Sequence, residues 1–129
     1  MKVNLTTCCA EKRKDEGLLP AKVRYKSPRV RTVVSESERT KTPLLIFSGK
    51  FGILDADDPI PWYDKVLTGE DVEAMMPRVI AQLQERSVTE VTLFARPKDT
   101  PGWAPYYAVI EQACGALEIP ITVEMIDTE

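Results

Sequence analysis

The alternation of apolar and polar residues marks four short strands along the chain. Residues 2–8 (KVNLTTC) alternate with a period of two, which predicts a first strand. The continuous apolar run LLIFS at 44–48 is typical of a central strand buried on both faces. The segments EVTLFA (90–95) and ITVEMI (121–126) predict a third and a fourth strand.

Helical patterns separate these strands. Ser27 followed by Pro28 predicts a helix over 28–37, because serine is a good N-cap and proline suits the first helical position. Pro105 marks the start of a helix near the carboxyl end of the chain.

The segment 68–87 predicts the longest helix. Its apolar residues recur at steps of three and one, and Thr68 with Asp71 resembles a capping box. Pro77 interrupts this pattern, so we expect a kink or two abutting helices. The stretches 9–26 and 55–64 are polar or rich in proline and aspartate, and predict loops.

Strands that alternate with helices predict a parallel sheet with right-handed crossovers. We therefore expect one domain over residues 1–129, an α/β fold with a three-layer α/β/α sandwich. Its mostly parallel sheet would have four strands in the order 2-1-3-4. In such sheets ligands bind beyond the carboxyl ends of the strands, where the strand order reverses.

Composition narrows the chemistry. The 129 residues contain no histidine, which excludes Ser-His-Asp and Cys-His catalysis within one chain and histidine-based metal sites. Three cysteines are too few for a four-thiolate zinc site, so we expect no metal and no cofactor. The chain shows no apolar run of about 20 residues and no secretory signal at its start, which predicts a cytoplasmic protein without a membrane segment.

Charge is divided unevenly along the chain. Residues 1–50 contain 12 Lys or Arg against 5 Asp or Glu, whereas residues 51–129 contain 5 against 15. The basic residues are densest between Lys12 and Arg31. This density indicates either a surface for phosphate or nucleic acid, or a solvated face that balances the acidic second half.

Two adjacent cysteines stand where the first strand leaves the sheet. Lys12 and Arg13 follow Cys8 and Cys9 closely, and nearby cations lower a thiol pKa. Cys8 would thus be an activated thiol or part of a nucleobase pocket. The alternative is that one cysteine is a small core residue.

The turn after the central strand, Ser48 to Gly52, is the second candidate. Its two glycines allow close approach of a ligand, Lys50 would hold a phosphate or carboxylate, and Phe51 would stack on a base. The spacing is not that of a Walker loop. A tight strand-to-loop turn without a ligand is the alternative.

Four aspartates of the 55–64 loop are the third candidate. They lack EF-hand spacing, and one carboxylate, Asp64, acting as a base or electrostatic stabiliser is favoured over a divalent ion. Beside it, Trp62 is expected to cover the core, whereas Tyr63 would either stack on a ligand or cover the core. Arg96, at the end of the third strand, would clamp an anion or pair with an aspartate nearby.

These motifs together resemble a small, largely uncharacterised bacterial and phage domain family. The family pattern is a Cys-containing strand leading to Lys, then Pro-Ala, Tyr-x-Ser, Ser-Ala-Lys-Tyr-Gly-Leu and Tyr-Asp before a Leu. The matching residues, over roughly 3–67, are Cys8-Cys9, Lys12 or Lys14, Pro20-Ala21, Tyr25, Ser27, Ser48 to Ile53, Tyr63-Asp64 and Leu67.

That family is in turn distantly similar to the uracil-DNA-glycosylase-like domain of archaeal tRNA-guanine transglycosylases and archaeosine synthases. The similarity implies a site for a base or nucleoside. The residues it places around that site are Cys8, Ser48, Lys50, Phe51 and Tyr63, with Tyr25 and Ser27 folded over it. Phe51 stands where the family has tyrosine, and the glycosylase histidine is absent, so ordinary uracil excision is not expected.

The leading hypothesis is that the chain binds a nucleotide, modified nucleobase or nucleic-acid end in a cleft at the carboxyl ends of the strands. An extension of this hypothesis is that it acts on an N-glycosidic or phosphate linkage. Lys12, Arg13 and Lys50 would hold phosphate, and Cys8 or Asp64 would be the reactive group. The alternative is a non-catalytic phage or host accessory module that docks on nucleic acid or a protein through its basic half. A third hypothesis is an enzyme with Cys8 or Cys9 as nucleophile.

Overall fold

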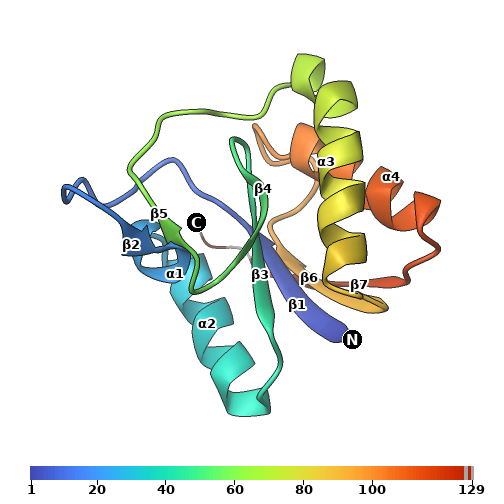
Figure 1. Ribbon diagram of the computed structural model, residues 1–129, viewed down its shortest axis with the longest axis horizontal. Coiled ribbons are helices and arrows are strands. Elements are labelled where there is room, and N and C mark those ends of the chain that lie inside the picture. Colours follow the sequence, from blue (N-terminus) through green and yellow to red (C-terminus); the bar gives the residue numbers. More distant parts are fainter. Residues whose placement is uncertain (127, 129) are drawn as a thin grey trace.

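A computed structural model describes residues 1–126 and 128, and its main sheet has five strands (Figure 1). The strand order is β4-β3-β1-β6-β7. The strands are β1 (Lys2–Thr7), β3 (Leu44–Ser48), β4 (Gly52–Asp55), β6 (Glu90–Ala95) and β7 (Ile121–Met125). All neighbours pair in parallel except β3 and β4, which are antiparallel.

The α/β class is therefore correct, and the prediction of a four-stranded sheet is wrong by one strand. The four predicted strands follow one another as β3-β1-β6-β7, and β4 extends the sheet beyond β3. Gly52 begins β4 at a φ of 75°, so the turn after Ser48 reverses the chain and pairs it back onto β3. The segment is short and opens with glycine, which hid it as a strand.

Helices cover both faces of the sheet (Figure 1). On one face lies α2 (Pro28–Thr40), and on the other lie α3 (Val72–Glu85) and α4 (Ala104–Ala116). A 3₁₀ turn, η1 (Gly69–Asp71), precedes α3. The helix α3 runs unbroken through Pro77, so the predicted division into two helices is wrong. Pro77 is the sixth residue of α3 and has no amide hydrogen to donate to the Glu73 carbonyl, so the helix continues with one backbone hydrogen bond fewer.

Local capping signals begin two of these helices as predicted. The Ser27 hydroxyl accepts a hydrogen bond from the Val30 amide at the start of α2. The Thr68 and Asp71 side chains form a capping box before α3. The helix α2 is three residues longer than predicted. It ends at Thr40, and the capping residue Lys41 has a left-handed conformation.

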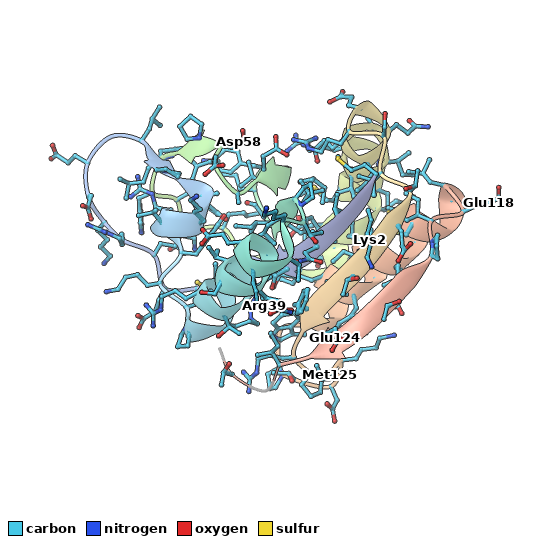
Figure 2. All side chains as sticks on the ribbon, turned by 90° about the horizontal axis from the view of Figure 1, so that it is seen from below. Lys2, Arg39, Asp58, Glu118, Glu124 and Met125 are labelled. Atoms are coloured by element: carbon cyan, nitrogen blue, oxygen red, sulfur yellow. The ribbon has the colours of Figure 1, made fainter. Side chains whose placement is uncertain are left out.

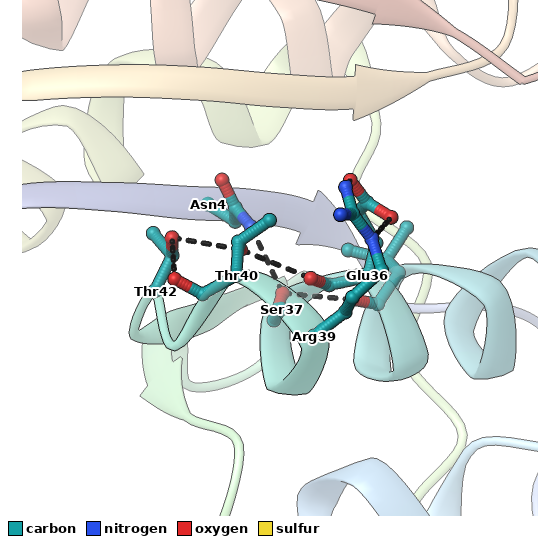
Figure 3. A network of polar contacts seen from close by, with 7 residues as sticks. Asn4, Glu36, Ser37, Arg39, Thr40 and Thr42 are labelled. Atoms are coloured by element: carbon teal, nitrogen blue, oxygen red, sulfur yellow. Dashed lines mark hydrogen bonds and ion pairs between the residues drawn. The ribbon is translucent and has the colours of Figure 1, made fainter.

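Polar contacts fix α2 against β1 and close its last turn (Figure 3). The buried Asn4 side chain donates to the Ser37 hydroxyl at 3.0 Å, and Ser37 donates to the Val33 carbonyl. Arg39 pairs with Glu36 on the exposed side. The Asn4–Ser37 contact links α2 directly to β1, so it helps to fix the position of the helix on the sheet.

The predicted loop 9–26 contains regular structure. It holds β2 (Leu19–Pro20) and α1 (Ala21–Arg24), and β2 pairs with β5 (Pro59–Ile60) from the second predicted loop. Arg24 is fully buried, and its guanidinium donates to four backbone carbonyls, those of Arg13, Asp15, Gly17 and Ile60. This side chain replaces the hydrophobic contacts that a polar segment cannot supply.

Apolar side chains from both layers form one core around β1, β3 and β6. The three strands contribute fully buried residues such as Val3, Ile46 and Val91. Within the described residues, no helix is long and apolar enough to cross a membrane.

Candidate functional site

A cavity of about 230 Å³ opens beyond the carboxyl ends of β1 and β6, where the strand order reverses. We call it the strand-end cavity. Its lining comes from the β1–α1 segment, from α2, from the 64–66 segment and from the loop before α4. The lining residues that carry its chemistry are Cys8, Lys12, Arg29, Asp64, Arg96, Trp103 and Tyr106. Four of them, Cys8, Lys12, Asp64 and Arg96, belong to the site predicted from the sequence.

Lys12 is the most unusual of these residues. It is only 8% exposed, yet its ammonium makes a single hydrogen bond, to the Ala10 carbonyl at 3.3 Å. No carboxylate of the described residues lies within ion-pair distance of it. The ammonium instead lies 4.6 Å from the centre of the Tyr63 ring and 6.0 Å from that of Tyr25. A buried charge without a counter-ion is costly, and an aromatic face offsets only part of that cost.

The backbone of the chain holds Lys12 in place. Residues 12 and 25 form an antiparallel bridge, with the Arg13 amide donating to the Arg24 carbonyl and the Lys26 amide to the Glu11 carbonyl. The lysine is thus anchored to a segment that the buried Arg24 guanidinium organises.

A buried chain of hydroxyl groups lies below Lys12. The Ser48 oxygen accepts hydrogen bonds from the Lys50 and Phe51 amides, both at 3.1 Å. These two donors occupy its acceptor sites, so its own proton goes to the Tyr63 hydroxyl, 2.8 Å away. Tyr63 in turn donates to Tyr25 at 2.6 Å. The Tyr25 hydroxyl is the last member of this series of hydrogen bonds.

Burial raises the pKa of both phenols in this chain, because the charged phenolate would be desolvated. The same effect raises the pKa of Tyr106, whose hydroxyl accepts from the Leu67 amide at 3.1 Å. All three tyrosines therefore stay protonated and act as hydrogen-bonding groups at neutral pH.

The turn from Ser48 to Gly52 is held from both sides. Gln82 of α3 accepts from the Ile53 amide and donates to the Phe51 carbonyl, while Arg78 donates to the Lys50 carbonyl. A Cβ at Gly52 would lie 2.3 Å from the Gln82 oxygen. A Cβ at Gly49 would lie 2.9 Å from the Leu67 amide nitrogen, so packing accounts for both glycines. Lys50 is exposed beside a separate cavity of about 440 Å³.

Arg29 was missed in the sequence and is central to the geometry. Its buried guanidinium donates to the Thr6 hydroxyl and to the Thr7 and Cys8 carbonyls, and it lies 4.9 Å from the centre of the Trp103 ring. It therefore fixes the end of β1 against the loop before α4. Its spacing, four residues before the buried Val33 on α2, was the signal that could have shown it.

The two adjacent cysteines occupy different environments. The Cys8 thiol is buried and lies 3.7 Å from the Tyr106 hydroxyl inside the strand-end cavity. The Cys9 thiol is half-buried and donates to the Glu11 carbonyl. Burial raises the pKa of Cys9 to about 11, despite the opposing charge of Arg29. Cys9 is therefore a thiol at neutral pH, which does not favour it as a nucleophile.

A wide groove adjoins the strand-end cavity on the side of α1. Its volume is about 1020 Å³, and Lys12 and Asp64 line both spaces. We call it the basic groove. Its cationic residues are Lys12, Arg13, Lys14, Lys22, Lys26 and Arg31. Trp62 is 45% exposed at its edge, so the prediction that it covers the core is wrong.

Five of the predicted binding residues line neither space nor the cavity beside Lys50. Ser48, Tyr63 and Gly52 hold the turn and the hydroxyl chain, Phe51 packs edge-on against Tyr63, and Ser27 caps α2. Tyr25 lines the basic groove together with Arg13.

The aspartate loop forms no cation site in the described part of the chain. Asp55 pairs with Arg86, Asp57 pairs with Lys22, and Asp58 accepts from the Asp55 amide. Asp64 is exposed and lies apart from them, at the junction of the three cavities.

Comparison with known proteins found no matching family model, no curated relative and no similar solved structure. The chemistry of the strand-end cavity is therefore the basis for a functional proposal.

Proposed function

We propose that this chain binds a nucleotide, a modified nucleobase or a nucleic-acid end in the strand-end cavity, with a phosphate on Lys12. The observation that carries the proposal is the buried Lys12 ammonium. It has one weak acceptor and no described carboxylate partner, and it borders a cavity that already contains cationic side chains. An anionic ligand would supply the missing partner of this ammonium. A hydrogen bond between two charged groups is stronger than one between neutral groups.

The size of the cavity supports a small ligand. About 230 Å³ is below the 300–1,000 Å³ that drug-sized ligands usually occupy. This volume suits one base or one phosphorylated sugar better than a dinucleotide cofactor. Trp103 and Tyr106 provide aromatic surface and a hydroxyl at the inner end, where a base would lie.

Asp64 is the carboxylate placed for chemistry on such a ligand. It is exposed at the mouth of the cavity beside Lys12. In N-glycosidic cleavage the sugar develops positive charge in the transition state, which a nearby carboxylate stabilises. Under this extension of the proposal, Asp64→Asn abolishes turnover and leaves binding of the intact ligand within about twofold.

The experiment is a thermal-shift screen of nucleobases, nucleosides, nucleotides and short single-stranded DNA and RNA at two salt concentrations. A ligand present at about 100 times its dissociation constant adds roughly 2.7 kcal/mol of stability. We expect nucleoside phosphates to raise the melting temperature of the wild type, and to raise that of Lys12→Met much less. Equal stabilisation of both proteins would refute the role of Lys12.

The basic groove favours a second candidate function, docking of the chain on nucleic acid. Six cations and three carboxylates, those of Glu11, Asp15 and Asp64, line this groove, so cations predominate. Binding through many phosphates weakens steeply as salt rises, whereas one small ligand in a pocket is much less sensitive. A shift seen only with oligonucleotides, and lost at the higher salt concentration, would favour this second function over the first.

A further inference from the structure

β7, which carries the labelled Glu124 and Met125, is the outermost strand on one side of the sheet (Figure 2). β7 pairs only with β6, and α2 lies above β1 and β3 rather than above this side of the sheet. The side chains of Val123 and Met125 are 43% and 60% exposed. A strand in this position offers unpaired backbone groups to another chain.

The hydrogen-bond pattern shows which groups point outward. The Val91 amide donates to the Pro120 carbonyl, and the Ile126 amide donates to the Ala95 carbonyl. In a parallel ladder these bonds recur at every second residue, so 120, 122, 124 and 126 face β6. The backbone groups of Ile121, Val123 and Met125 therefore face away from the sheet. Within the described residues no side chain bonds to them.

At the opposite edge of the sheet, side chains bond to the backbone groups of β4. On β4 the Ile53 amide donates to Gln82, the Ile53 carbonyl accepts from Arg86, and the Asp55 amide donates to Asp58. Side chains thus bond to the backbone groups of the β4 edge, whereas none of the described side chains bonds to those of the β7 edge.

We infer that β7 pairs with β7 of a second copy, antiparallel and about a two-fold axis at Val123. This register places all three outward-facing residues opposite outward-facing residues, with Ile121 opposite Met125 and Val123 opposite itself. Their apolar side chains then meet on one face of the sheet. On the other face each Glu124 lies opposite Thr122.

The neighbouring registers are worse for a physical reason. A shift of one residue places outward-facing groups opposite groups already bonded to β6. Centring the pair on Glu124 places two carboxylates directly opposite each other, which is destabilising. Only the register at Val123 combines full backbone pairing, apolar contact and separated charges.

The test uses sedimentation velocity on the wild type from about 1 to 500 µM, a range suited to an interface of this small size. We expect a concentration-dependent dimer. Val123→Pro removes an outward amide at the axis and should leave a monomer, while Val123→Thr keeps that amide and should dimerise. Circular dichroism establishes that each variant is folded.

Oxidative cross-linking tests the register. Val123→Cys places two thiols across the axis at a backbone spacing that a disulfide accepts, so it should form a covalent dimer. Glu124→Cys places each new thiol opposite Thr122 and should cross-link much more slowly. The wild type, in which Cys8 and Cys114 are buried and Cys9 is half-buried, measures the background cross-linking. A monomer throughout the concentration range, or faster cross-linking of Glu124→Cys, would overturn the inference.

Discussion

Replacing Lys12 with methionine separates a binding role for this residue from a structural one. Methionine has a similar length and no charge, so it fills the space of the lysine stem beside the Tyr63 ring. The ammonium makes one hydrogen bond of 3.3 Å and one close aromatic contact at 4.6 Å. The free protein therefore loses little attraction and is relieved of a desolvated charge.

The magnitudes follow from these contacts. A buried charge costs several kcal/mol unless it is paired, and a desolvated cation–π contact returns about 2 kcal/mol. We expect the free energy of unfolding of Lys12→Met to lie within about 1 kcal/mol of the wild type, or above it. A hydrogen bond to a charged group contributes about 1.5–3 kcal/mol, so a nucleoside phosphate should bind about 10- to 150-fold more weakly.

Urea unfolding and isothermal titration calorimetry measure the two quantities on the same samples. Lys26→Met is the matched control, since it removes an exposed cation of the basic groove with the same change of charge. This control should bind a small ligand as the wild type does. A loss of 3 kcal/mol or more of stability in Lys12→Met, with unchanged ligand affinity, would show that Lys12 is structural, since breaking a buried ion pair costs that much.

Further predictions address the parts that hold the site. Tyr63→Phe removes the acceptor of the Ser48 proton and the donor to the buried Tyr25 hydroxyl, and should cost about 1–3 kcal/mol in urea unfolding; no loss would mean that solvent replaces these bonds. Gly52→Ala should destabilise more than Gly17→Ala, because both have positive φ but only the former meets a glutamine oxygen at 2.3 Å; equal losses would contradict the packing argument. The backbone and side-chain hydrogen bonds of the capping box lower the pKa of Asp71 to about 2. Because the pKa of Asp71 is lower in the folded protein than in the unfolded one, the ionised carboxylate stabilises the fold at pH values above the unfolded-state pKa. The stability advantage of the wild type over Asp71→Asn should therefore shrink as pH falls from about 5 to 2. An advantage independent of pH would refute this prediction. Alkylation of Cys9, followed by mass spectrometry, should accelerate about tenfold per pH unit up to its pKa of about 11; fast alkylation at pH 7 would reopen the nucleophile hypothesis.

The sequence predicted what depends on neighbours along the chain. The serine N-cap of α2, the capping box before α3 and the strand over 44–48 rely on local signals, and the structure contains each of them. The edge strand β4 and the ordered segment after Lys12 depend instead on side chains from distant positions. Gln82 of α3 holds β4, and Arg24 ties the segment after Lys12 to the Ile60 carbonyl, 36 residues further along the chain.

The candidate site divides in the same way. Cys8 and Arg96 line the cavity because the carboxyl ends of parallel strands meet there, which topology alone predicts. The family resemblance places Ser48 and Tyr63 around the site, yet they are buried partners in a hydroxyl chain. Arg29, a buried cation beside this edge, was hidden because it lies on a helix whose apolar face it shares.

The most direct test of the central claim is a titration of ¹⁵N-labelled wild-type protein with a nucleoside 5′-monophosphate, followed by amide chemical shifts. We expect the shifted amides to cluster at residues 8–12, 103, 104 and 106 around the strand-end cavity, and the unphosphorylated nucleoside to need a higher concentration to reach saturation. Shifts confined to residues 22–31 of the basic groove, or no shifts at millimolar ligand, would contradict a phosphate on Lys12.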